Sequence, residues 1–72
     1  MNKSFAIWVN GKDAAHSGWL TESGALVANA RMAIRFPSLP EATERLTANG
    51  YVDTTDVTVR NSAYVCDVTL GW

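Results

Sequence analysis

The chain contains one histidine, His16, and one cysteine, Cys66, the two side chains best suited to nucleophilic or metal chemistry. His16 stands close to Asp13 and Ser17, but neighbours on one stretch of loop seldom converge into a catalytic triad. One histidine and one cysteine are also too few for a zinc site without several carboxylates or a second subunit. We therefore predict no catalytic residue and no metal site, and an enzyme would have to depend on His16.

Cys66 belongs to an alternating segment near the end of the chain. It shares one side of that segment with Tyr64, Val68 and Leu70, a pattern that indicates a buried thiol and not a reactive one. The five glycines are dispersed, with neither a G-x-G-x-x-G run nor a phosphate-binding lysine motif. No cofactor is expected.

What remains is recognition by surface side chains. Three tryptophans are many for 72 residues, and aromatic residues with arginine are typical of binding hot spots. The partner-binding residues that we predict are Trp8, Trp19, Arg31 and Arg35. If the two arginines shared one helical face, they could clamp a carboxylate or phosphate. In the alternative interpretation, Trp19 packs beneath the 10–18 loop and Trp8 merely covers the sheet.

These residues must be positioned by a small set of elements, of which a helix over 39–48 is the clearest. Ser38 is a suitable N-cap, Glu41 three residues later completes a capping box, and Asn49-Gly50 supplies a left-handed C-cap. Its apolar side chains fall on one face, as in a helix lying on a sheet. That face comprises Leu39, Ala42 and Leu46.

Strand patterns precede and follow this helix. In residues 4–10, Phe5, Ile7 and Val9 alternate with Trp8, so the first three should face the helix and Trp8 the opposite side. Residues 29–33 are predicted to form a short helical turn, followed by extended chain. The other predicted strands are 18–21, 25–27, 56–60 and 64–72. The fold class is α+β, with a four- to five-stranded antiparallel sheet (β-β-β-α-β-β) under one helix.

Length and composition bound the remaining possibilities. The 72 residues make one domain, 1–72, and dimerisation would add buried area to so small a core, so a homodimer stays open. A net charge of −1 excludes both the strong positive field of a typical nucleic-acid binder and the acidity of a DNA mimic. No apolar run reaches the length of a membrane span, and the first segment alternates like a strand and not a signal peptide. A lone cysteine suits a reducing cytoplasm.

One arrangement of residues resembles a known group. Ala33, Phe36, Ser38, Glu41 and Ala42 form A-x-x-F-x-S-x-x-E-A, preceded by Gly-Trp-Leu-Thr and followed by a glycine and a strand. This resembles small domains common in phage, prophage and plasmid genomes, over about residues 5–60. The chain departs from that group in Pro37 and in its last strand-like segment. The resemblance implies an anti-defence protein, such as an anti-CRISPR inhibitor that binds a host complex without catalysis.

We therefore expect a non-enzymatic protein-binding module, an inhibitor of a bacterial defence complex that acts in the host cytoplasm. The alternative is a small nucleic-acid-binding accessory domain. It would use Arg31, Arg35, Lys3, Lys12 and a stacking tryptophan on an open sheet.

Overall fold

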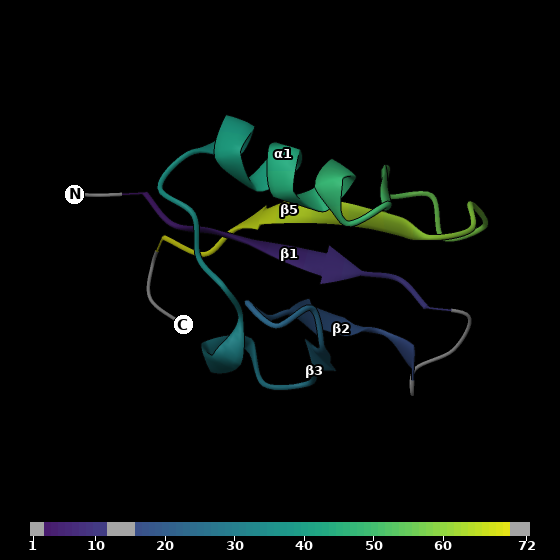
Figure 1. Cartoon of the computed structure of the whole chain (residues 1–72), viewed down its shortest axis with the longest axis horizontal. Helices are drawn as coiled ribbons and strands as arrows, with labels where there is room; N and C mark the ends of the chain where they lie inside the picture. Colours follow the sequence, from purple (N-terminus) through teal and green to yellow (C-terminus); the bar gives the residue numbers. More distant parts are fainter. Residues whose placement is uncertain (1–2, 12–15, 70–72) are drawn as a thin grey trace.

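A computed structural model describes residues 3–11 and 16–69 of the chain. In chain order the elements are β1 (Phe5–Val9), β2 (Gly18–Leu20), β3 (Leu26–Val27), the 3₁₀ turn η2 (Ala30–Met32), α1 (Leu39–Ala48), β4 (Val52–Asp53) and β5 (Ser62–Asp67). The strands form one sheet in the order β3-β2-β1-β5-β4. Helix α1 covers one side of this sheet, and η2 lies on the side away from α1 (Figure 1). The predicted α+β fold is confirmed.

Helix α1 has the predicted bounds because both of its ends are capped. The Ser38 hydroxyl accepts a hydrogen bond from the Glu41 amide at 3.4 Å, and Pro40 occupies a first-turn position that needs no amide donor. Past the other end, Gly50 adopts a φ of 87°, which glycine takes without strain. Leu39 differs from expectation: it lies at the first position of the helix and is 52% exposed.

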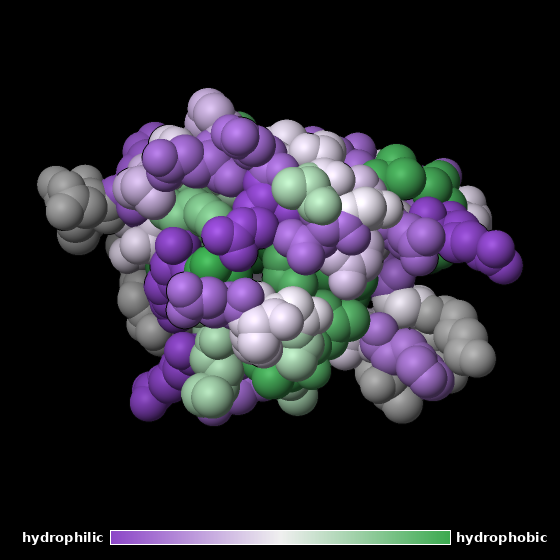
Figure 2. Space-filling view, in the orientation of Figure 1, coloured by the Kyte–Doolittle hydropathy of each residue, from purple (hydrophilic) through white to green (hydrophobic). Residues whose placement is uncertain are grey.

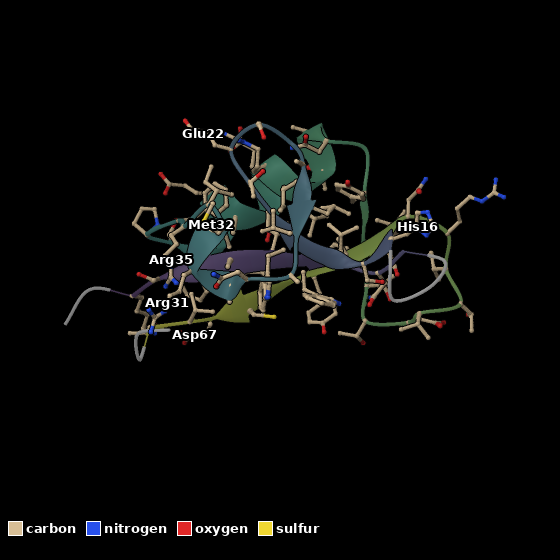
Figure 3. All side chains as sticks on the ribbon, turned by 90° about the horizontal axis from the view of Figure 1, so that it is seen from below. His16, Glu22, Arg31, Met32, Arg35 and Asp67 are labelled. Carbon is tan, nitrogen blue, oxygen red and sulfur yellow. The ribbon has the colours of Figure 1, made fainter. Side chains whose placement is uncertain are left out.

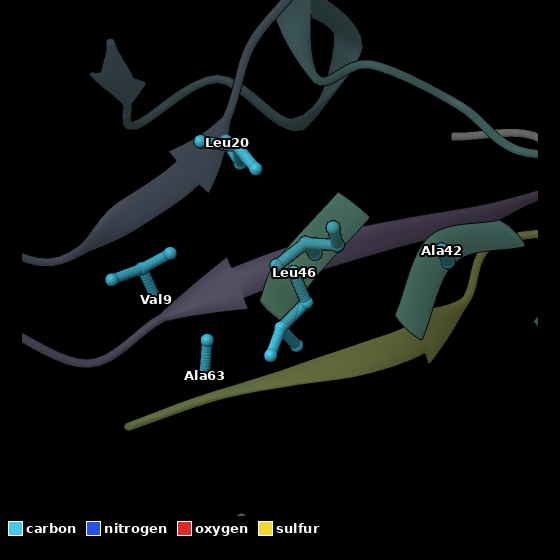
Figure 4. Close-up of a cluster of buried hydrophobic side chains, with 6 residues drawn as sticks. Val9, Leu20, Ala42, Leu46 and Ala63 are labelled. Atoms are coloured by element: carbon cyan, nitrogen blue, oxygen red, sulfur yellow. The ribbon is translucent and has the colours of Figure 1, made fainter. Parts of the chain in front are cut away.

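The core between α1 and the sheet is built as the alternation of β1 predicts. Ile7 and Val9 of β1 pack with Leu46 of α1, and Phe5 packs against the same cluster. The buried residues of this cluster are Ile7, Val9, Leu20, Ala42, Leu46 and Ala63 (Figure 4). We call this side of the sheet the helix face and the other side the back face.

The edge strand β4 departs from the sequence prediction. It lies at Val52–Asp53 and not at 56–60, and it runs parallel to β5, so the sheet is mixed and not antiparallel throughout. Asp56 explains the difference, since its carboxylate accepts hydrogen bonds from the Thr58 amide at 2.9 Å and the Thr58 hydroxyl at 2.7 Å. These local bonds favour a turn over a strand ladder.

The last strand also starts earlier than predicted. Ser62, expected in a turn, opens β5, which ends at Asp67. The predicted strand continued to residue 72, but residues 70–72, which include Leu70, lie outside the described residues. Lys12, named above for the nucleic-acid alternative, also lies outside them.

Candidate functional site

A row of aromatic side chains crosses the back face. Trp8 of β1 is paired with Trp19 of β2 on one side and with Tyr64 of β5 on the other, and directly paired residues of antiparallel strands share a face. The two indole rings meet edge to face, with centroids 5.1 Å apart and planes at 76°. Trp8 Nε1 donates to Asn10 Oδ1 at 3.0 Å, which fixes the orientation of its ring.

The two tryptophans of this row are not equally accessible. Trp19 is 7% exposed and belongs to a second buried cluster with Ala6, Ala33 and Val68. Trp8 packs against that cluster and remains half-buried, as does Tyr64. Trp19 therefore belongs mainly to the core, as the alternative interpretation of the sequence had it. That interpretation placed Trp19 beneath the 10–18 loop, whereas the structure packs it with Ala33 and Val68. Trp8 and Tyr64 keep part of their rings in solvent.

The segment 28–35 lies over part of the back face. Its 3₁₀ turn is capped by Asn29, whose Oδ1 accepts a hydrogen bond from the Arg31 amide at 3.0 Å. At its far end the Ile34 amide donates to the Leu20 carbonyl at 3.0 Å, which ties the segment to β2. The predicted helical turn followed by extended chain is thus present. Figure 2 shows hydrophobic side chains reaching the surface around this segment and the neighbouring β2 and β3.

Two arginines and a methionine occupy the outer side of this segment. Arg31 is exposed, Met32 is 63% exposed, and Arg35 is half-buried. All three lie toward the end of the sheet where β5 finishes at Asp67, and His16 lies at the opposite end (Figure 3). We call Arg31, Met32 and Arg35 the arginine surface.

The arginines do not share a helical face. The 3₁₀ turn ends at Met32, and Ala33 takes an extended conformation with ψ of 142°, so Arg35 lies beyond the turn. The hypothesis of a helical arginine clamp is therefore wrong. The arginine surface is instead a short turn followed by an extended stretch.

Charges of both signs occur at this end of the sheet. Asp67 accepts hydrogen bonds from the side chain and the amide of Thr69, and these bonds lower the pKa of its carboxyl. The positive charge of Lys3 lowers it further, as the weakest of these effects. The carboxyl of Asp67 is thus held in its ionised form.

His16 and Cys66 are not brought together. Cys66 pairs with Ala6, whereas His16 lies at the other end of the sheet, beyond Val9. Cys66 is half-buried, and burial raises the pKa of its thiol, which disfavours the nucleophilic thiolate. Within residues 3–11 and 16–69, no three His, Cys, Asp or Glu side chains gather in a way that could hold a metal ion.

Two residues of the back face were missed at the sequence level. Met32 and Tyr64 both reach the surface here, and only Met32 had a local signal, as a large apolar residue directly after Arg31. The exposure of Tyr64 depends on which strands flank it, and no local pattern shows that.

Comparisons with known proteins give no further identification. No protein-family model, curated protein or solved structure matches this chain. Within the described part of the chain, no helix has the length and hydrophobicity to cross a membrane.

Proposed function

We propose that this protein is a non-enzymatic protein-binding module whose contact region is the arginine surface together with the partly exposed side chain of Trp8. The observation that carries the proposal is the 63% exposure of Met32 directly beside Arg31. Burying a flexible thioether removes apolar area from water, while arginine can bind carboxylates or backbone carbonyls around it. Met, Arg and Trp are all enriched at protein interfaces.

The resemblance to small phage and mobile-element domains supports a more specific form of this proposal. In that form the partner is a bacterial defence complex, of the CRISPR type or another type, and the protein inhibits it by occupying a surface. The protein would work in the cytoplasm of the bacterial host. Arg31 and Met32 lie on a turn whose segment is tied to β2 by the hydrogen bond from the Ile34 amide to the Leu20 carbonyl, so the backbone that carries them is ordered before a partner binds.

Quantitative affinity capture tests the proposal. Tagged wild-type protein is incubated with lysates of bacteria that carry defence systems, alongside the double variant Arg31→Glu, Met32→Asp. The matched control is Arg60→Glu, Val57→Asp, which makes the same kinds of change at exposed residues of the opposite end. We expect a stoichiometric partner with wild type and control, and its loss with the double variant. Equal recovery by all three proteins would contradict the proposed surface.

The same samples test for self-association. Light scattering on wild-type protein and on the double variant reports the molar mass of each. A homodimer would be built through the arginine surface only if the double variant is monomeric where wild type is dimeric.

A second candidate is binding of single-stranded nucleic acid. Its supporting observation is the row formed by Trp8 and Tyr64, which are paired on adjacent strands and half-exposed, the arrangement on which bases stack. Anisotropy of labelled single-stranded DNA and RNA at low salt tests it. Salt-dependent binding that is lost in Trp8→Ala would favour this candidate over a protein partner, and no binding at low salt would eliminate it.

A further inference from the structure

Among the described residues, Met32 is the exposed large hydrophobic side chain that carries an atom open to oxidation. Four large hydrophobic side chains are exposed within residues 3–11 and 16–69: Met32, Leu39, Val52 and Val57. The other three are hydrocarbons, whereas Met32 has a thioether sulfur and is 63% exposed. Figure 3 shows it with Arg31 and Arg35 on the arginine surface. The sulfur therefore lies within the region that we propose for partner binding.

The other sulfur that the structure describes is less open to oxidation. Cys66 is half-buried, and burial raises the pKa of its thiol. A thiol reacts with oxidants as the thiolate, so a raised pKa slows the reaction. A thioether has no proton to lose, and its oxidation needs no change of protonation state. Burial and protonation thus protect Cys66, while the side chain of Met32 stays exposed.

The backbone around Met32 is held by hydrogen bonds that do not involve its side chain. The Met32 amide donates to the Asn29 carbonyl at 3.0 Å, and the Ala33 amide donates to the Ala30 carbonyl at 3.1 Å. Ala33 is 8% exposed and belongs to the second buried cluster, which anchors the turn on the sheet. A chemical change in the Met32 side chain therefore alters the surface and leaves the turn intact.

Oxidation by a peroxide changes the chemical character of such a side chain. A lone pair of the sulfur attacks one oxygen of hydrogen peroxide, so that an S–O bond forms and the O–O bond breaks. The sulfur loses two electrons and the peroxide gains them. The second oxygen leaves as water with both protons of the peroxide. The product, methionine sulfoxide, is polar, and methionine sulfoxide reductases convert it back to methionine.

The sulfoxide would weaken the arginine surface in two ways. Its oxygen is a hydrogen-bond acceptor, and burying it against the apolar part of a partner costs free energy unless a donor reaches it. Arg31, the residue directly before Met32, offers guanidinium donors. A guanidinium that bonds the sulfoxide has fewer donors left for a carboxylate or carbonyl of the partner.

We propose that Met32 is an oxidation site that controls the arginine surface: a peroxide converts it to the sulfoxide, which prevents partner binding, and enzymatic reduction restores binding. The loss of binding rests on the proposed protein-binding function. The site of oxidation does not, because it follows from the exposure of Met32 and the protection of Cys66.

The first experiment locates the oxidation. The full chain is treated with hydrogen peroxide at about pH 5, where the Cys66 thiol is protonated, and mass spectrometry of its peptides follows the gain of one oxygen by Met32. We expect Met32 in the folded protein to react within about twofold of its rate in denaturant, and faster than Cys66. A rate more than tenfold lower in the folded protein, or faster oxidation of Cys66, overturns the proposal.

Thermal melting of the same samples separates the surface from the fold. The oxidised protein should keep the Tm of the untreated protein, because no hydrogen bond of the turn involves the Met32 side chain. A clearly lower Tm would mean that the sulfoxide acts by disrupting the fold, and this overturns control of the surface.

The second experiment tests the loss of binding by affinity capture after the peroxide has been removed. It compares untreated wild type, oxidised wild type, oxidised wild type treated with methionine sulfoxide reductases, and oxidised Met32→Leu, which keeps an apolar side chain without sulfur. We expect at least tenfold less partner with the oxidised wild type, and full recovery with the reductase-treated sample and with Met32→Leu.

The remaining outcomes each overturn part of the proposal. Equal capture by oxidised and untreated wild type, or an equal loss in oxidised Met32→Leu, would show that Met32 does not control binding. Capture of no partner by untreated wild type would overturn the proposed function and the control of binding with it. The oxidation rates of the first experiment would still decide whether Met32 is the oxidation site.

Discussion

The two faces of the sheet are closed in different ways. The helix face is covered by α1, a capped ten-residue helix whose Leu46 is fully buried. The back face is covered by the irregular segment 28–35, which contributes the short side chains of Ala30 and Ala33. A regular helix presents an apolar stripe to the core over several turns, whereas a single 3₁₀ turn cannot. The back face consequently keeps Trp8 and Tyr64 partly in water, and this is where a partner can gain apolar contact.

The largest expected effect is on the helix face. Leu46→Ala removes a fully buried side chain that packs against Ile7, Val9 and Ala63, so it should lower the free energy of unfolding by about 2–5 kcal/mol. Chemical denaturation monitored by circular dichroism measures it. Met32→Ala, on the back of the molecule, should change the same quantity by less than about 0.5 kcal/mol. Comparable losses in the two variants would refute the contrast between the faces.

The second largest expected loss of stability comes from Gly18 of β2, which lies against the edge strand β3. A Cβ atom at Gly18 would lie 2.8 Å from the Val27 carbonyl oxygen and 3.1 Å from its amide nitrogen, and backbone atoms cannot move aside cheaply. We expect Gly18→Ala to cost about 1–3 kcal/mol and to raise amide exchange in β3. Ser23→Ala, in the exposed turn of the same hairpin, serves as the control and should leave amide exchange in β3 unchanged.

The helix face could be predicted from the sequence because its signals are local. The cap at Ser38, the spacing of Ala42 and Leu46, and the alternation of β1 are all read within a few residues. The edge strand β4 could not, since two residues are too short to show a period. The valines at 57 and 59 suggested a strand instead, but the hydrogen bonds of Asp56 form a turn there.

The candidate surfaces depend more on pairing across strands. Arg31 and Arg35 were identified from residue type alone, and the structure confirms the turn and extended stretch that carry them. The burial of Trp19 depends on Ala33 and Val68, which come from other parts of the chain. The pairing of Trp8 with Tyr64 depends on the register of β1 and β5, which no single segment specifies.

A smaller effect tests the cap that holds α1 over the helix face. Ser38→Ala removes the hydrogen bond to the Glu41 amide and should cost about 1 kcal/mol, toward the lower end of the range for N-caps because the bond is 3.4 Å long. Ser38→Gly should cost only a few tenths of a kcal/mol, because glycine allows the cap conformation and lets water reach the amide. Thermal melting of both variants measures the difference. Equal losses would show that the hydroxyl is not the source of the cap's stability.

The smallest effect concerns Cys66, which shares the back face with the aromatic row but is close to the buried cluster of Val68. Burial raises the pKa of its thiol above the ordinary value of 9.0, so the folded protein retains a proton that the unfolded chain releases. This contribution to stability is fully present below the unfolded pKa and is lost as the pH rises through the folded pKa. The Tm of wild type should therefore fall slightly more than that of Cys66→Ala over this alkaline range.

Alkylation by iodoacetamide measures the same property directly. The rate for the folded protein should still be rising at pH values where the unfolded chain in denaturant has reached its plateau, because only the thiolate reacts. Matching pH profiles in the two states would mean that water reaches Cys66 as freely as in the unfolded chain. In that case the segment 28–35 would fail to close even this end of the back face, and the open surface would extend from Trp8 to Cys66.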